Sequence, residues 1–76
     1  MSAATAEFGR RVRVRRNELG LTQEALADLA HLHWTFVGQV ERGRRNLTLH
    51  NILKLAAALD IDAAMLVNGL ANPPYD

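Results

Sequence analysis

The sequence predicts an all-α fold, a compact domain of five short helices. With 76 residues the chain has room for one small hydrophobic core. Apolar residues make up 49% of the sequence and aromatic residues only 5%, with leucine and alanine the commonest apolar types. The apolar residues also recur three and four positions apart, between threonine caps and glycine stops. These features are typical of a small helical domain rather than of a disordered chain or a β-sandwich.

The first helix is predicted over residues 4–19. Phe8, Val12 and Leu19 fall near one face at helical spacing, so we expect that face to be buried. Gly20 follows directly and is expected to end the helix in the left-handed conformation.

A second helix is predicted over residues 23–30, with Thr22 as its N-cap. We expect it to bury Leu26, Ala27 and Ala30. Only about three residues, 31–33, separate it from the next apolar run, so the two helices meet at a steep angle across a tight turn. The two alanines permit close backbone approach there, although alanine is also simply a good helix former.

Three further helices are expected at residues 33–42, 49–59 and 62–67. The first of them buries Val37 and Val40 and ends at Gly43. Thr48 and Asp62 are the expected caps of the other two. Asn68 and Gly69 follow the last helix and stop it.

Charge is distributed unevenly along the chain. Residues 1–46 carry eight arginines against five acidic residues, a net charge of +3, whereas residues 47–76 carry one lysine against three aspartates, a net charge of −2. A basic half is expected if one end of the domain meets a polyanion.

Several classes of function are disfavoured by what the sequence lacks. There is no cysteine, which favours an intracellular location, and no apolar stretch resembling a signal peptide or a membrane span, so we expect a cytoplasmic protein. No catalytic constellation, phosphate-binding glycine loop or effector pocket is evident, so we expect neither an enzyme nor a cofactor. His31, His33 and His50 lack a cysteine or a positioned carboxylate, so no metal site is expected.

Three motifs give the chain a family resemblance. They are LGLTQEALA at 19–27, VERGRRN at 40–46 and LKLAAALDID at 53–62. With them the chain resembles the XRE type of helix-turn-helix protein, the type of the phage repressors and Cro, over about residues 8–70. Within that family it is most similar to the controller proteins of restriction–modification systems. The resemblance implies a lambda-repressor-like fold in which residues 22–42 form the helix-turn-helix.

The resemblance also implies which side chains read DNA bases. Trp34, Thr35 and Gln39 would lie on the outward face of the recognition helix. Gln39 would most naturally read adenine through a bidentate pair, and Thr35 a base edge or a thymine methyl. Trp34 could instead be a stacking platform or pack on the preceding helix. Gly38 is expected at another exposed position, where it lets the backbone approach closely.

The expected contacts to DNA phosphates are six residues in and around the motif, Gln23, His33, Arg42, Arg44, Arg45 and Asn46. The arginine run at residues 10–16 spreads around its helix and is expected to be mostly solvated surface, with a phosphate contact by Arg10 or Arg11 as the alternative. Arg16 and Glu41 match a buried ion pair that joins the first helix to the recognition helix.

Four positions depart from the family pattern. His31 stands where a turn glycine is usual, so it must accept a left-handed backbone or the turn must differ. Asp60 replaces a glycine at the end of a helix, Arg15 replaces an apolar residue, and Trp34 replaces a polar contact. Base preference therefore does not transfer from relatives.

The last helix is apolar on more than one face, through Met65, Leu66, Val67 and Leu70. In the family this end forms a two-fold dimer, so we expect these residues at a homodimer interface within residues 60–70. The alternative is that they only close the core of a monomer. We expect residues 1–70 to form the DNA-binding domain and residues 71–76 a flexible tail.

These observations predict a homodimeric, sequence-specific transcriptional regulator that binds double-stranded DNA. Each subunit would place its recognition helix in the major groove, with half-sites about 34 Å apart. Two alternatives remain open at this point: an antitoxin that also represses its own promoter, and a helical module that binds only protein. No membrane partner and no small-molecule effector are expected.

Overall fold

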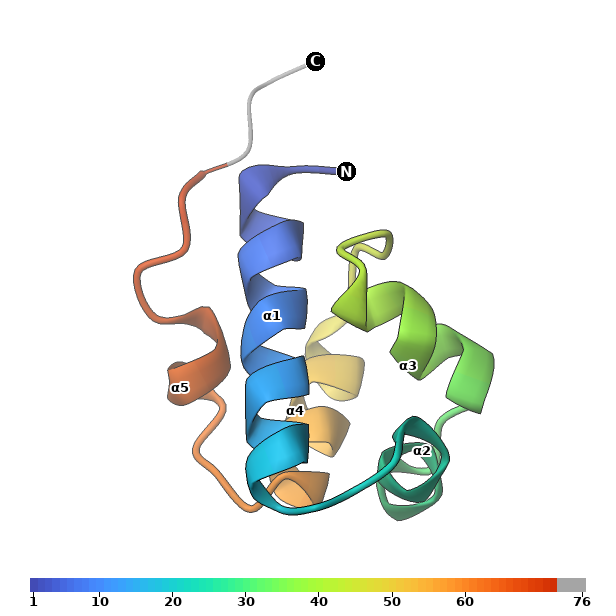
Figure 1. Ribbon diagram of the computed structural model, residues 1–76. Coiled ribbons are helices and arrows are strands. Elements are labelled where there is room, and N and C mark those ends of the chain that lie inside the picture. The colour runs from blue at the N-terminus through green and yellow to red at the C-terminus, as the bar shows by residue number, and fades with distance from the viewer. Residues whose placement is uncertain (73–76) are drawn as a thin grey trace.

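The computed structural model describes residues 1–72, and this part of the chain is all-helical, as the sequence predicted (Figure 1). The five helices are α1 (Ala3–Glu18), α2 (Gln23–Ala30), α3 (Trp34–Glu41), α4 (Leu49–Ala58) and α5 (Ala64–Val67). Each predicted helix is present; α2 has the predicted ends, and the ends of the others shift by at most two residues. None of the helices in the described part has the length and apolar character needed to cross a bilayer.

Side-chain caps define where the helices begin. Thr22 accepts a hydrogen bond from the N–H of Ala25 (3.0 Å), and Thr48 accepts one from Asn51 (3.2 Å). These two predicted caps are confirmed. The third is wrong: Asp62 accepts from the N–H of Ala64 (2.9 Å), but the N-cap of α5 is Ala63, one residue later, whose side chain has no hydrogen-bonding group. α1 has a cap that we had not predicted, a reciprocal capping box between Ser2 and Thr5.

Two non-glycine residues adopt left-handed backbone at helix ends. His31 (φ 56°) ends α2, and Asp60 (φ 53°) follows the end of α4. At Asp60 the left-handed turn lets two N–H groups bond back to carbonyls of α4, which satisfies the open end of the helix. Arg15 donates from Nε to the carbonyl of Leu59 (2.9 Å), so this arginine helps to close the same helix end.

The core lies between the helices and is almost entirely aliphatic. Its buried members are Phe8, Val12, Leu26, Ala27, Ala30, Val37, Val40, Leu55, Ala56, Leu59 and Leu66. The predicted burial of Leu26, Ala27 and Ala30 on α2 is confirmed. Leu19 is the exception, since 38% of it is exposed. It is the C-cap residue of α1, beyond the turns of that helix that pack on the core.

Two glycines allow α1 to lie directly against the end of α3. A Cβ on Gly9 would collide with the carbonyl oxygen of Val40, so only glycine permits this approach. Gly43 (φ 73°) ends α3 in the left-handed region, and a Cβ there would lie 2.8 Å from the Cα of Ala6. The direction of α3 is therefore set by backbone contact with α1.

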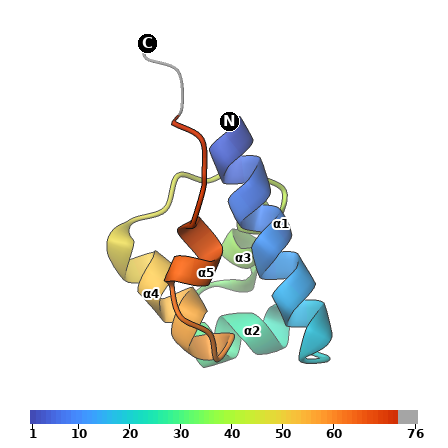
Figure 2. The same cartoon turned by 90° about the vertical axis from the view of Figure 1, so that its left-hand side faces the viewer.

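The helices place two distinct surfaces on opposite sides of α1. In Figure 1, α3 lies to the right of α1 and α5 to the left. Figure 2 shows the α5 side, with α4 and α1 beside α5 and α3 behind them. Functional residues on α3 are thus separated from those on α5 by the body of the domain.

Candidate nucleic-acid interface

The turn between α2 and α3 is short and held by local hydrogen bonds. His31 adopts the left-handed conformation (φ 56°, ψ 44°), one of the two outcomes expected where a glycine is missing. The N–H of Leu32 donates to the carbonyl of Ala27 (2.9 Å) and closes the end of α2. His33 follows in extended conformation and begins the next helix.

His33 was expected to begin the third helix, and it is the N-cap of α3, with a side-chain capping bond that the sequence analysis did not predict. Its Nδ1 accepts a hydrogen bond from the N–H of Thr35 (3.1 Å). A neutral imidazole that accepts at Nδ1 carries its proton on Nε2, so its second nitrogen is a donor suited to a phosphate oxygen. Histidine is not among the preferred cap residues, which is why composition gave no signal.

The exposed face of α3 carries two of the three predicted base-reading residues. Trp34 is 55% exposed, and its ring stacks on that of His33 with centroids 6.0 Å apart. Thr35 is also exposed, whereas Gln39 is only half-buried in a contact with Arg45. Trp34 thus stands at the N-terminal end of the helix and Gln39 at its C-terminal end, more than one turn apart.

Gly38 differs from its prediction, and Gln23 makes a contact that was not predicted. The side-chain amide of Gln23 donates from Nε2 to Glu41 (3.2 Å) and is thus engaged within the protein. Gly38 is buried rather than exposed, because the side chains of Gln23 and Arg42 cover it. Gln23 therefore links α2 to α3 in this structure. The sequence could not show this, since the contact joins residues on different helices.

A buried ion pair joins α1 to α3, as the resemblance implied. Arg16 donates from Nε to Oε2 of Glu41 (2.6 Å) and from Nη2 to Oε1 (3.0 Å). Its Nη1 donates to the carbonyl of Leu21 (2.9 Å), at the start of the link to α2. The hydrogen-bonded carboxylate of Glu41 raises the pKa of Arg16 above its ordinary value. These contacts, with Gln23, fix the relative positions of α1, α2 and α3.

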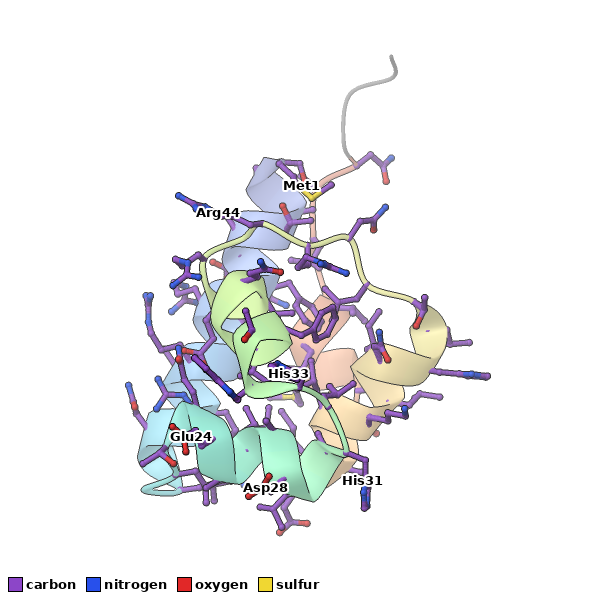
Figure 3. All side chains as sticks on the ribbon, turned by 90° about the vertical axis from the view of Figure 1, so that its right-hand side faces the viewer. Met1, Glu24, Asp28, His31, His33 and Arg44 are labelled. Carbon is purple, nitrogen blue, oxygen red and sulfur yellow. The ribbon has the colours of Figure 1, made fainter. Side chains whose placement is uncertain are left out.

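The loop after α3 presents three exposed arginines. Arg42, Arg44 and Arg45 and the exposed Asn46 lie on it, next to the C-terminal end of α3. Figure 3 looks onto this side of the molecule, with Arg44 near one end and His33 at the start of α3. Glu24 and Asp28 lie along α2 on the same side, so the face is basic beside the loop and acidic along α2.

The arginines of the first helix are mostly engaged on the α5 side. Arg10 and Arg11 both donate to Glu7 (2.8 Å), and Arg11 also donates to the carbonyl of Asn68 (2.7 Å). Arg15 bonds the end of α4. These contacts favour a structural role for Arg10 and Arg11 over the alternative of gripping phosphate.

The predicted dimer residues divide between the surface and the core. Met65 is 65% exposed and Val67 40%, while Leu70 is half-buried. Leu66 does not belong with them, because at 1% exposure it is part of the chain's own core. A four-residue helix cannot show from its sequence which of its consecutive apolar residues points inward. Among the described residues, no group of three histidine or acidic side chains is placed to hold a metal ion.

Residues 12–73 match the sequence profile of a family described as Helix-turn-helix. The chain belongs to the helix-turn-helix family. In this helix-turn-helix protein, the matched residues include α2, α3 and the short turn that joins them. The match spans all the core residues of the fold except Phe8.

The most similar relatives include proteins that control restriction–modification systems. The control protein C.SmaI of Serratia marcescens is 44% identical over 63 residues, which cover 80% of this chain and 75% of that protein. The crystal structure of the restriction–modification controller protein C.AhdI from Aeromonas hydrophila matches with a TM-score of 0.80 and 53% identity, over 82% of this chain and 94% of that one. The P22 c2 repressor, solved in complex with a synthetic operator, matches with a TM-score of 0.76 and 31% identity, over the same shares of the two chains.

Proposed function

We propose that this protein is a transcriptional regulator of the controller type, which binds double-stranded DNA with sequence specificity as a homodimer. The observation that carries the proposal is the presentation of α3. Trp34 and Thr35 are exposed on this helix, and the buried Arg16–Glu41 ion pair fixes the helix to α1. The loop with the exposed arginines, residues 42–46, follows the helix directly. The similarity to two named controller proteins supports the regulatory role. A repressor of the same fold, solved with an operator, supports the DNA-binding role.

In this proposal the residues of α3 and its flanks have separate tasks. Thr35, Gln39 and Trp34 contact base edges in the major groove. Arg42, Arg44 and Asn46 in the loop, and Nε2 of His33, contact phosphates. The arginines supply salt-dependent affinity that is independent of sequence, and the residues on α3 discriminate between operators. The protein would act in the cytoplasm, on DNA, and the proposal assigns it no catalytic activity.

The homodimer is proposed to form through the α5 side of the domain. Met65 and Val67 are exposed apolar side chains there, next to Leu70. Two open apolar hollows lie on this side, of about 240 Å³ beside Met65 and about 140 Å³ beside Val67 and Leu70. A two-fold axis through this surface would let the same residues meet their copies and would repeat α3 about 34 Å along the DNA.

Selection of binding sites from random DNA tests the proposal most directly. We expect an enriched operator with two related half-sites, retained in a gel shift at both low and moderate salt. Gln39→Ala should then lose about 1–3 kcal/mol on that operator and little on random DNA. Arg44→Ala should weaken both alike and flatten the salt dependence. Failure of the wild-type chain to enrich any sequence would overturn the proposal.

The dimer surface needs its own experiment. Met65→Glu should shift the chain from dimer to monomer in sedimentation equilibrium, because it places a charge in the proposed apolar interface. Leu29→Glu is the matched control, since Leu29 is a similarly exposed apolar residue (56%) on α2. Equal effects of the two substitutions, or none from Met65→Glu, would place the interface elsewhere.

A further inference from the structure

Gln39 and Arg45 form a contact that neither the family resemblance nor the proposed function assigns. Nη1 of Arg45 donates to Oε1 of Gln39, at 3.1 Å. The Arg45 guanidinium carbon also lies 4.8 Å from the centroid of the Phe36 ring, in a cation–π arrangement. Phe36 is half-buried and packs against the core, so the ring is a fixed platform. Arg45 is therefore held at two points on α3.

This contact determines which way the side-chain amide of Gln39 points. Arginine has only donors, so it can face the amide oxygen but not the amide nitrogen. With Oε1 turned toward Arg45, Nε2 and its two hydrogens are directed away from it. Arg45 keeps further N–H groups beside the amide. Together the two side chains present a cluster of donors.

An edge that presents mostly donors favours a different base from the one that a free glutamine favours. Glutamine reads adenine by accepting from N6 and donating to N7, which requires its oxygen. Guanine presents two acceptors, N7 and O6, in the major groove and suits donors alone. An adenine amino group would have to share Oε1 with Arg45 and would lie against the N–H groups of that arginine. We propose that Arg45 is a positioning residue that turns Gln39 from an adenine reader into a reader of guanine.

The proposal rests on the proposed function and changes the predicted role of Arg45. As a phosphate contact, Arg45 would contribute only charge, as Arg44 does. Arg44 lies next to it on the same exposed loop, and no side-chain hydrogen bond involves it in the described part of the chain. Arg44→Ala is therefore a matched control, since it removes the same charge from the neighbouring position.

The experiment is a binding-site selection with the full chain, followed by competition gel shifts. Selection with Gln39→Ala identifies the base pair that Gln39 reads, because the base preference at that position of the operator is lost in this variant. At that position we expect the wild-type chain to prefer guanine over adenine by about tenfold or more. Arg45→Ala should reverse or abolish that ratio, while Arg44→Ala should weaken both operators and leave the ratio unchanged. Arg45→Lys keeps the charge, and we expect it to lose the preference as well, because lysine lacks the planar guanidinium that lies over Phe36 while it donates to Gln39.

The possible outcomes separate this inference from the function on which it rests. Equal weakening of the guanine and adenine operators by Arg45→Ala would make Arg45 a phosphate contact and overturn the inference alone. The same conclusion follows if the wild-type chain prefers adenine at the Gln39 position, or if Gln39→Ala alters no position. A wild-type chain that enriches no sequence would overturn the proposed function as well. Thermal unfolding of each variant confirms that its fold is retained, since Arg45 is exposed.

Discussion

Glu41 carries the only buried charge among the residues that the structure describes, with 3% of its side chain exposed. Its carboxylate accepts two hydrogen bonds from Arg16, at 2.6 and 3.0 Å, and one from Gln23, at 3.2 Å. Arg16→Met would remove the charge partner and keep an apolar stem of similar size. The carboxylate would then stay buried with only the Gln23 amide as its partner.

The expected cost follows from the distances and the burial. Two unit charges about 3 Å apart attract each other by about 5 kcal/mol at an effective dielectric constant of about 20. Part of that attraction is offset by desolvation, so we expect Arg16→Met to cost about 3 kcal/mol, at the low end for a broken buried pair. The whole domain of 76 residues should have a free energy of unfolding of about 4–11 kcal/mol. The melting temperature should therefore fall by about 12 °C or more.

A double-mutant cycle measured by urea unfolding tests this reasoning. Glu41→Leu should cost less than Arg16→Met, because Arg16 is 13% exposed and keeps its bond to the carbonyl of Leu21. The double variant should be more stable than the sum of the single effects implies, because it leaves no buried charge unpaired. Single costs below about 1 kcal/mol that simply add would refute a buried, coupled pair.

Three further predictions concern packing, pH and charge. Gly9→Ala should lower the free energy of unfolding measured in urea, because its Cβ would collide with a backbone carbonyl of α3. This collision should outweigh the helix propensity of alanine, which favours the helix by about 1 kcal/mol over glycine. A stabilised variant would contradict the close approach of α1 to α3. Hydrogen bonds from two arginines lower the pKa of Glu7 from 4.5 to about 2, so its stabilising effect is present above about pH 4.5 and lost as the pH falls toward 2. The difference in unfolding free energy between the wild type and Glu7→Gln should shrink over that range, and a difference that stays constant would contradict the shift. Glu24→Gln should raise DNA affinity a few-fold at low salt and less at high salt, because it removes a negative charge on the proposed DNA side. Glu18→Gln, on the α5 side, is the control and should leave DNA affinity unchanged at both salt concentrations. Equal effects of the two substitutions would show that α2 does not face the DNA.

Local chemistry explains why so much of the fold could be predicted. Thr22 and Thr48 cap helices because their side chains bond to N–H groups three residues away, within the same segment. Gly20 and Gly43 end helices because they adopt the left-handed conformation without strain. Family resemblance added the Arg16–Glu41 pair, which no local rule could have suggested across 25 residues.

The structure departs from the predictions at side chains that contact a residue on another helix or loop instead of lying in solvent, or the reverse. Periodicity could not decide which of Met65, Leu66 and Val67 entered the core, since α5 is a single turn. Nothing in the sequence indicated that Gln23 bonds Glu41, or that Arg45 faces Gln39.

The number and order of the helices and the face that α2 buries could thus be predicted from the sequence, because these depend on hydrogen bonds and spacing within one segment. The orientations of the Gln23 and Gln39 amides, and the pairing of Arg45 rather than Arg44, came from the packing of the helices and could not be predicted. Those features depend on where α1 sets α3, and that position is fixed by backbone contact at Gly9 and by the ion pair of Glu41.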